Sequence, residues 1–444
     1  MKIVLCTTYL LIASMGLVSC RKDWIPENHP VDIGIDVKFY STEYDEKLSP
    51  SGAEVKIMTI KGDLIFSGKT DQKGHLSIPQ LAPDNYRVQA TKLYNFAEFN
   101  TLLERAEESD IAFSSLITDY TVNPNNPTSL NLSLQAGQYS PLVIKQLYYA
   151  GSSTTQGASF RDQFIEIYNN SAEVQYADSL YIGEAMGTLN ASTTYAYQPV
   201  SKQYDWSKSY GMPANINANE DYVYARTVLM IPGTGKQYPI NPGESIVIAA
   251  TAINHKSPYS GTDGKEISVK DPSLTIDLSN ADFEAHYAPY LGTVRPLASD
   301  VDNPNVPNLT VFKFSGTDLI MSVAAQQSWF IFRNGNLGEF DKWPSYDYPF
   351  ADGRVKTGVY LQIPVANILD AVDLQSAITN TNYPKKFNAE IDAGQKSVTG
   401  GQNSSNSIIR KTKEIINGRK VLSDTNNSTE DFITIKAEPR AFAN

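Results

Sequence analysis

The chain has 444 residues, enough for two or three domains, and its 37 Lys and Arg against 48 Asp and Glu give a net charge of −11. This acidic balance disfavours nucleic acid as a partner and an electrostatic grip on anionic lipid. Tyrosine (26) greatly outnumbers tryptophan (4), and long helical periodicities are few. The composition therefore favours a mainly β extracellular body.

Residues 1–19 are predicted to be a lipoprotein signal peptide. Lys2 provides the positive start, and the apolar stretch that follows is too short and too interrupted for a stable membrane span. The stretch ends in Leu17-Val18-Ser19-Cys20, which resembles the bacterial lipobox. We therefore expect Cys20 to carry the lipid and residues 20–30 to form a tether, although an ordinary secretory signal with a chance cysteine is the alternative.

Charged residues follow the lipidation site, as in the surface-export signals of the Bacteroidota, which Lys22-Asp23 resembles in part. The predicted location is therefore the outer membrane, held by the lipid at Cys20 and facing the cell surface. A tether that faces the periplasm is the alternative.

Residues 31–137 are predicted to form a first β-sandwich. Ile33, Ile35 and Val37 alternate with polar residues, which is the pattern of a strand with one solvated face. Farther on, the segment from Thr70 to Ala90 carries T-D-x-x-G and then L-x-P-x-x-Y-x-V-x-A. It resembles the carboxypeptidase-regulatory or prealbumin-like β-sandwich, which implies a small module of that fold. Residues 93–112 break the pattern as a helical insertion, either a contact element or a lid on an open edge.

Residues 138–444 are predicted to form a larger β-sandwich with long insertions. Four motifs occur in order, namely F-I-E-I-Y-N from Phe164, L-Y-I from Leu180, P-G-E-S-x-V-I-A from Pro242 and D-T-N-N-S-x-x-D-F from Asp424. This order resembles the lamin-tail-like immunoglobulin-fold β-sandwich. About 260 residues separate the first motif from the last, more than twice what one such sandwich needs. Within this stretch, residues 359–374 are predicted to be a strand that enters a short helix.

The succession of lipobox, prealbumin-like module and lamin-tail-like body is similar to an uncharacterised Bacteroidota lipoprotein family, known as a domain of unknown function. The resemblance covers nearly all of the chain after the signal peptide, and it implies no established activity.

An aromatic-rich insertion offers the candidate ligand or partner contacts. Its rings could stack on a sugar or on another aromatic ligand. The alternative is that the same rings pack the faces of the sandwich. The candidates are Tyr195, Tyr197, Tyr204, Trp206 and Tyr210.

Metal and catalytic signals are weak. The four histidines are scattered, so we expect no zinc site and no cofactor. The segment from Asp424 to Asp431 is predicted to be a turn held by side-chain bonds to the backbone, with calcium as the alternative. Glu166 is expected to face solvent or to pair with Arg161 or Arg410, opposite a buried Ile167. No catalytic motif occurs, so a non-enzyme is expected.

These patterns favour a surface lipoprotein that binds a small-molecule or glycan nutrient, or that docks on an outer-membrane transporter β-barrel of the TonB-dependent type. The alternative is a structural or adhesive envelope protein. A hydrolase with an unrecognised carboxylate pair is the least favoured reading.

Overall fold

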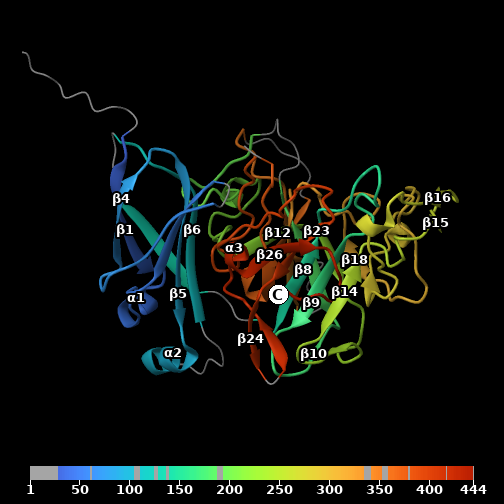
Figure 1. Ribbon diagram of the computed structural model, residues 1–444, viewed down its shortest axis with the longest axis horizontal. Helices are drawn as coiled ribbons and strands as arrows, with labels where there is room; N and C mark the ends of the chain where they lie inside the picture. Colours follow the sequence, from blue (N-terminus) through green and yellow to red (C-terminus); the bar gives the residue numbers. More distant parts are fainter. Residues whose placement is uncertain are drawn as a thin grey trace, which may run out of the picture.

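The computed structural model describes residues 29–60, 63–104, 111–124, 129–136, 140–187, 194–334, 342–352, 359–378, 381–416 and 418–443. They form mainly β structure in two bodies that lie side by side, which confirms the predicted fold class (Figure 1). The signal peptide, Cys20 and the proposed domain boundary at 137 and 138 lie outside the described residues. No helix in the described ranges is long and apolar enough to cross a membrane.

The first body is a β-sandwich around one apolar core. Its seven strands pair in the order β3-β2-β5-β6-β7-β1-β4. Alternate residues of β1, such as Ile35 and Val37, are fully buried, whereas their neighbours are more exposed, as the sequence pattern predicts. The strands are β1 (Val31–Phe39), β2 (Glu54–Thr59), β3 (Leu64–Lys69), β4 (His75–Leu81), β5 (Asn85–Tyr94), β6 (Ile111–Thr121) and β7 (Leu130–Ala136).

The second body packs two larger sheets against each other. One sheet has the order β17-β14-β9-β8-β23-β26, and the other has the order β20-β21-β12-β11-β19-β22 with β18 paired to β12. The first contains β8 (Leu142–Tyr148), β9 (Phe164–Asn169), β14 (Ser245–Ala249), β17 (Phe283–Glu284), β23 (Asn406–Arg410) and β26 (Phe432–Lys436). The second contains β11 (Leu180–Ala185), β12 (Tyr222–Met230), β18 (Thr310–Lys313), β19 (Ser328–Arg333), β20 (Ser345–Tyr346), β21 (Tyr360–Pro364) and β22 (Ile368–Val372).

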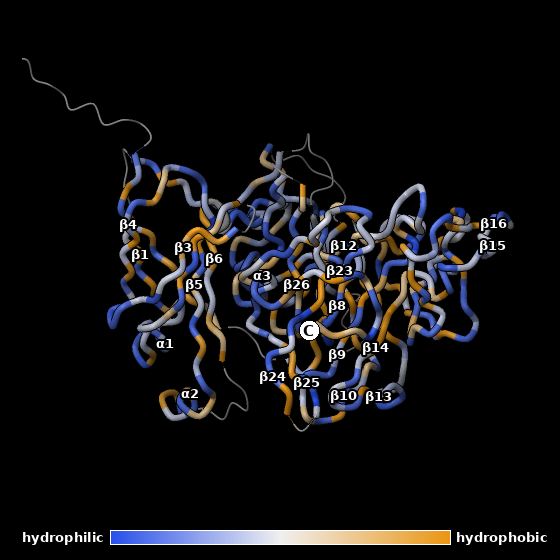
Figure 2. Tube along the Cα trace, viewed as in Figure 1, coloured by the Kyte–Doolittle hydropathy of each residue, from blue (hydrophilic) through white to orange (hydrophobic). Residues whose placement is uncertain are grey.

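Apolar side chains from both sheets fill the space between them. Ile144 and Ile167 from one sheet share a core with Trp329 and Ile331 from the other. The apolar strand segments lie inside each body, and polar loops surround them (Figure 2). Burial of this apolar surface is the main source of stability for both bodies.

Short elements complete the described part. The two-stranded pairs are β10 (Gln175–Tyr176) with β13 (Pro239–Ile240), β15 (Tyr259–Ser260) with β16 (Glu266–Ile267), and β24 (Thr412–Ile416) with β25 (Arg419–Leu422). The α-helices are α1 (Thr42–Lys47), α2 (Phe96–Leu103) and α3 (Ser428–Asp431), and the 3-10 turns are Trp206–Lys208, Pro272–Leu274, Ala288–Tyr290 and Val365–Asn367.

Helix α2 lies within the predicted helical insertion at 93–112. Its N-terminus is capped by Asn95, whose side chain accepts a hydrogen bond from the Ala97 backbone N–H. Phe99 and Leu103 are buried in the core of the first body. At least one face of the insertion therefore packs on the sandwich.

One local prediction holds in part and another is wrong. The predicted strand and short helix within 359–374 are present as β21 and the 3-10 turn Val365–Asn367, but a second strand, β22, follows and pairs with β19. Glu166 is fully buried and does not face solvent. The Nζ of Lys145 lies 2.8 Å from its Oε1, and the hydroxyl of Ser245 donates to the same carboxylate at 2.5 Å. Its ionic partner is thus a lysine on the adjacent strand.

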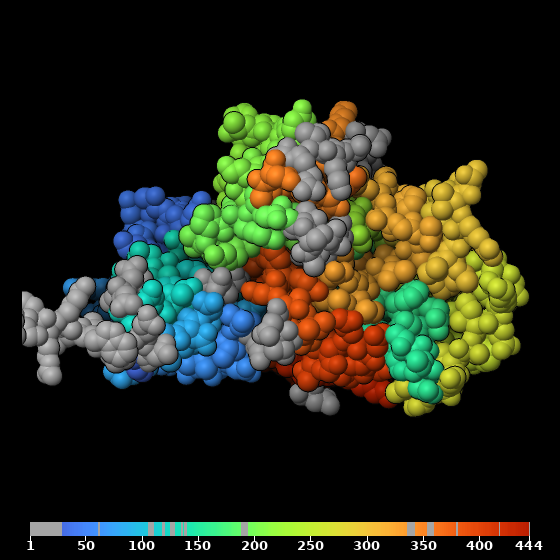
Figure 3. All heavy atoms as spheres, turned by 90° about the horizontal axis from the view of Figure 1, so that it is seen from above, coloured from blue at the N-terminus to red at the C-terminus, as the bar shows by residue number. Residues whose placement is uncertain are grey.

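The two bodies meet where strands β2 and β5 of the first body face the C-terminal segments of the second. Lys56 Nζ lies 2.7 Å from Glu430 Oε2, and Arg87 donates from Nη2 to Gln395 Oε1 at 3.1 Å. Seen from above, the C-terminal segments lie beside the first body (Figure 3). The junction is therefore polar, with charged and amide groups supplied by both sides.

Candidate functional site

A cavity of about 430 Å³ opens at the junction of the two bodies. The first body contributes Ile60 and Arg87, and the second contributes residues from 375–378, 381–382 and 395–399 together with Thr429. Its volume falls in the range typical of small-molecule sites, and sites of this kind occur preferentially between domains. We therefore take this cavity as the candidate functional site.

Strand β5 presents opposite faces to the two bodies because side chains alternate along a strand. Val88 and Ala90 enter the core of the first body. Arg87 lies on the other face and lines the cavity, and only 3% of its surface is exposed. One face of strand β5 therefore packs in the apolar core of the first body, and the opposite face places the Arg87 cation in the junction.

Arg87 has few partners for a buried cation. Its Nη2 donates to Gln395 Oε1, but its Nε is buried and has no hydrogen-bond partner in the described part of the chain. No carboxylate of the described residues lies within ion-pair distance of it. Burial lowers the pKa of Arg87 to about 10, and the more distant charge of Asp373 opposes this shift. The guanidinium therefore remains charged at neutral pH while its charge lacks a direct counterion.

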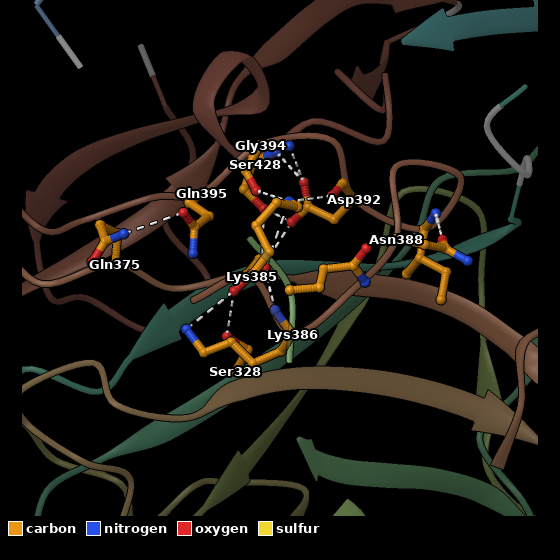
Figure 4. Close-up of polar contacts among 12 residues, drawn as sticks. Ser328, Gln375, Lys385, Lys386, Asn388, Asp392, Gly394, Gln395 and Ser428 are labelled. Atoms are coloured by element: carbon orange, nitrogen blue, oxygen red, sulfur yellow. Dashed lines mark hydrogen bonds and ion pairs between the residues drawn. The ribbon is translucent and has the colours of Figure 1, made fainter. Parts of the chain in front are cut away.

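Two amides form the wall beside Arg87. Gln375 Nε2 donates to Gln395 Oε1 at 3.2 Å and to Asn382 Oδ1 at 2.6 Å, and its own oxygen accepts from the Tyr383 N–H at 2.7 Å. Gln395 Nε2 in turn donates to the carbonyl of Tyr383 at 3.3 Å. These bonds fix the orientation of both amides, and Figure 4 shows the one that joins Gln375 to Gln395. The Gln395 oxygen therefore faces Arg87 in a preset geometry.

Buried charges lie beneath this wall. Lys386 Nζ lies 3.3 Å from Asp373 Oδ1, and Lys385 Nζ lies 3.6 Å from Asp373 Oδ2. Burial would raise the pKa of Asp373, but the charges of Lys386 and then Lys385 outweigh it and hold that pKa below its ordinary value. Asp373 therefore stays ionised and neutralises one of the two lysines. Lys385 also donates to the carbonyls of Asp392 and Gly394, at 2.6 and 2.7 Å.

The same segment is fastened to helix α3. Asp392 accepts hydrogen bonds from the Ser428 N–H at 2.8 Å and from the Ser428 hydroxyl (Figure 4). Gly394 approaches the helix so closely that a Cβ there would lie 2.3 Å from Asn427 Oδ1 and 2.5 Å from the Thr429 N–H. Only glycine fits at this position without a shift of the backbone. The segment that carries Gln395 is therefore tightly packed against helix α3.

The charge of the lining contrasts with that of the whole protein. Arg87 and Lys396 line the cavity, and none of the lining residues within the described ranges is an aspartate or glutamate. Lys396 is half-buried, and burial, with the nearby charge of Lys411, lowers its pKa. A chain of net charge −11 thus presents a locally cationic cavity. Low-dielectric walls strengthen the field of such charges on an incoming anion.

A second hollow adjoins the cavity. A second, more open hollow of about 550 Å³ shares Ala377, Ile378 and Thr399 with it and extends over Gly400 and Gly401. A ligand longer than a single small molecule could therefore extend from the cavity along this hollow.

The five predicted aromatic contacts do not line this cavity. Tyr195, Tyr204 and Trp206 are buried, and Trp206 stacks on Tyr224 with ring centroids 3.7 Å apart. For these three residues the structure shows the packing role that was the alternative. Tyr197 and Tyr210 are 43% and 63% exposed. Ligand contact at these two rings stays a prediction.

The acidic segment from Asp424 to Asp431 packs around Arg410. Arg410 Nη1 lies 3.1 Å from Asp424 and 3.3 Å from Asp431, and Nη2 lies 2.6 Å from Asp370. Asp431 also accepts from the Thr425 N–H at 2.9 Å, so a turn held by side-chain bonds to the backbone is present, as predicted. No group of three or more metal-ligating side chains with a suitable arrangement occurs within the described ranges. Calcium binding here is an untested alternative.

The residues that line the cavity do not form a recognisable motif in the sequence. Arg87 sits within Tyr86-Arg87-Val88-Gln89-Ala90, where polar residues alternate with apolar ones as in any half-solvated strand. The one available signal is that an arginine at the centre of such a strand needs a partner if its polar face is covered. Sequence periodicity does not show that the second body covers this face.

Residues 241–439 match the family described as "Protein of unknown function (DUF4876)". This match includes every second-body residue that lines the cavity, and it excludes Arg87. No curated protein matches the chain.

Among solved structures, the chain is similar to a DUF4876 family protein from Bacteroides thetaiotaomicron VPI-5482, with 22% identity over 93% of this chain and 97% of that one and a TM-score of 0.50. This similarity shows a shared fold. A putative adhesin from Bacteroides ovatus matches at 11% identity over 35% of this chain and 54% of that one, with a TM-score of 0.17. A DUF3823 family protein from Bacteroides ovatus ATCC 8483 matches at 13% identity over 49% and 98%, with a TM-score of 0.14. Scores this low establish no common fold.

Proposed function

We propose that this chain is a non-enzymatic binding protein of the bacterial envelope that captures a small polar nutrient in the cavity between its two bodies. The observation that carries the proposal is the junction cavity itself, with its rigid amide wall and its two cations. Rigid polar groups around a concave site lower the entropic cost of binding a solute. In a purely structural spacer, a buried cation without a counterion would lower stability and provide no benefit.

The proposed location is the outer membrane, with the lipid on Cys20 as anchor and the cell surface as the exposed side. The support for it is Leu17-Val18-Ser19-Cys20 together with the partial export signal that follows. We also propose that the first body is prealbumin-like and the second lamin-tail-like. In this arrangement the anchor leads directly into the first body, and the cavity lies between the two bodies.

The proposed absence of enzymatic activity rests on the roles of the buried acids near the cavity. Asp373 is engaged by two lysines, and Asp392 accepts hydrogen bonds from Ser428 at the start of helix α3. Neither carboxylate lines the cavity, so neither has direct contact with a ligand placed there. A glycosidase would require two carboxylates that face the substrate.

The test is binding to the full chain, measured by calorimetry with a set of small polar solutes that includes sugars, sugar acids and amino acids. A solute that binds the wild-type protein should lose affinity when Ser397→Trp fills the cavity. Tyr210→Ala is the matched control, because it alters an exposed ring away from the cavity. If no solute binds, or if binding is insensitive to Ser397→Trp, the proposal fails. Capture through a docked transporter would then be the next hypothesis to test.

A further inference from the structure

The junction cavity places a buried guanidinium, with an unsatisfied donor, beside a set of hydroxyl-bearing side chains. Arg87 Nε lacks a protein partner among the described residues, and the Arg87 side chain is almost completely buried. Leaving a buried donor of a charged group without a partner costs free energy. The Arg87 guanidinium, which lines the cavity, therefore has less hydrogen bonding and less charge compensation from the described residues than a buried cation normally has, and a ligand that brings an acceptor to it gains a favourable contact.

An anion satisfies this requirement better than a neutral acceptor. Among the described residues, two cations and no carboxylate line the cavity, so a bound anion meets attraction without repulsion from this lining. Hydrogen bonds between a guanidinium and a carboxylate are charge-assisted and are roughly twice as strong as neutral ones. The planar fork of arginine also matches the two oxygens of a carboxylate.

The remainder of the lining indicates the rest of the ligand. Hydroxyl and amide side chains dominate it, and Ile60, Ala377 and Ile378 are its apolar members. The hydroxyl and amide groups suit a molecule with several hydroxyls of its own, because each hydroxyl both donates and accepts. The lining is poor in apolar surface, which disfavours a fatty acid or an aromatic acid. In addition to Gln375 and Gln395, these hydroxyl and amide side chains are Ser376, Thr381, Asn382, Ser397, Thr399 and Thr429.

We propose that the junction cavity binds a polyhydroxylated carboxylate, of the sugar-acid class, with its carboxylate on Arg87. This inference rests on the proposed function and deepens it by assigning the substrate class. Arg87 is the anchoring residue, Lys396 adds attraction at the wall, and Gln395 sets the orientation of the guanidinium. The open hollow over Gly400 and Gly401 is where the next unit of a longer acidic chain would lie.

The experiment is calorimetric titration of the full chain with D-glucuronate, D-glucose and sulfate as separate probes, at one ionic strength. Glucuronate and glucose differ in the carboxylate alone, and sulfate carries charge without the sugar hydroxyls. We expect glucuronate to bind more tightly than either of the others. Arg87→Gln should weaken glucuronate binding by about tenfold or more, because it removes a charge-assisted contact. Lys396→Gln should weaken it less.

Arg295→Gln is the matched control, because it removes an exposed arginine that does not line the cavity. Each other result overturns the assignment in a distinct way. Equal affinities for glucose and glucuronate would show a neutral-sugar site, so the binding function would stand while the anion assignment would fall. If sulfate bound as tightly as glucuronate, the sugar hydroxyls would contribute nothing to affinity, and the site would be an anion site without preference for a sugar acid. Glucuronate binding that Arg87→Gln leaves unchanged would place the ligand elsewhere, and binding by none of the probes would overturn the assignment entirely.

Discussion

Two buried arginines in this protein have opposite surroundings. Arg410 and Arg87 are 2% and 3% exposed. Arg410 lies among three aspartates, whereas Arg87 contacts a neutral amide and leaves its Nε unsatisfied in the described part of the chain. The pKa shifts follow this difference. Burial lowers the pKa of both, but the charges of Asp370, Asp424 and Asp431 overcome burial at Arg410 and raise its pKa.

The difference separates a structural cation from one available to a ligand. A charge buried at a cost of several kcal/mol is normally paired within the protein. Arg410 fulfils this rule and joins strands β22 and β23 to the C-terminal turn. Arg87 departs from it at the wall of a cavity. We infer that its counterion comes from outside the chain.

Removal of the paired arginine should have the largest effect. Arg410→Met leaves buried carboxylates without their cation, and it should lower the free energy of unfolding by about 3–5 kcal/mol. Urea denaturation of the two proteins measures this directly. Arg295→Met serves as the control, with an expected change below about 0.5 kcal/mol at an exposed site. A loss below 1 kcal/mol for Arg410→Met would contradict a structural role for the cluster.

The buried pair of Lys145 and Glu166 offers a second internal comparison. Glu166→Gln removes the charge that Lys145 faces at 2.8 Å, so we expect a loss of about 2–3 kcal/mol in stability. Glu244→Gln is the control, because Glu244 is exposed at a turn. Equal stability of the two variants in denaturant titrations would show that the buried pair contributes little.

The sequence predicted the fold more fully than the site. Alternation along β1, and the run of apolar residues around Ile167, gave the strands and their buried faces. Glu166 was misread because alternation assigns it to the face opposite Ile167, and that face is covered here by Lys145 and the C-terminal segment. Arg87 was missed for the same reason. Period-two patterns show that a face is polar, but whether another layer covers it depends on contacts between distant segments, such as Arg87 with Gln395.

A pH effect should follow from buried Asp318. Burial raises its pKa to about 7, Ser299 donates to it at 2.6 Å, and the charge of nearby Asp300 raises the pKa further. An acid whose pKa is raised on folding contributes stability that is present below its unfolded pKa near 3.8 and is lost as the pH rises through about 7. Asp318→Asn should therefore raise the melting temperature more at pH 8 than at pH 5, because at pH 5 only part of this stability has been lost. A stabilisation that is equal at both pH values would contradict this assignment.

Removal of the unpaired arginine should have the smallest effect on stability. Arg87→Gln in the protein without ligand should change the free energy of unfolding by less than about 1 kcal/mol, because the lost bond to Gln395 is offset by the removal of a buried uncompensated charge. The same denaturant titration that tests Arg410→Met measures this change. A loss of 3 kcal/mol or more would show that Arg87 is as well compensated as Arg410.

The most direct test of the contrast is a crystal structure of the full chain with bound D-glucuronate. We predict that the sugar-acid carboxylate lies within hydrogen-bond distance of the Arg87 guanidinium, while the three aspartates remain the partners of Arg410. A carboxylate bound away from Arg87, or an Arg87 Nε that is hydrogen-bonded to a group of the protein itself, would contradict the account.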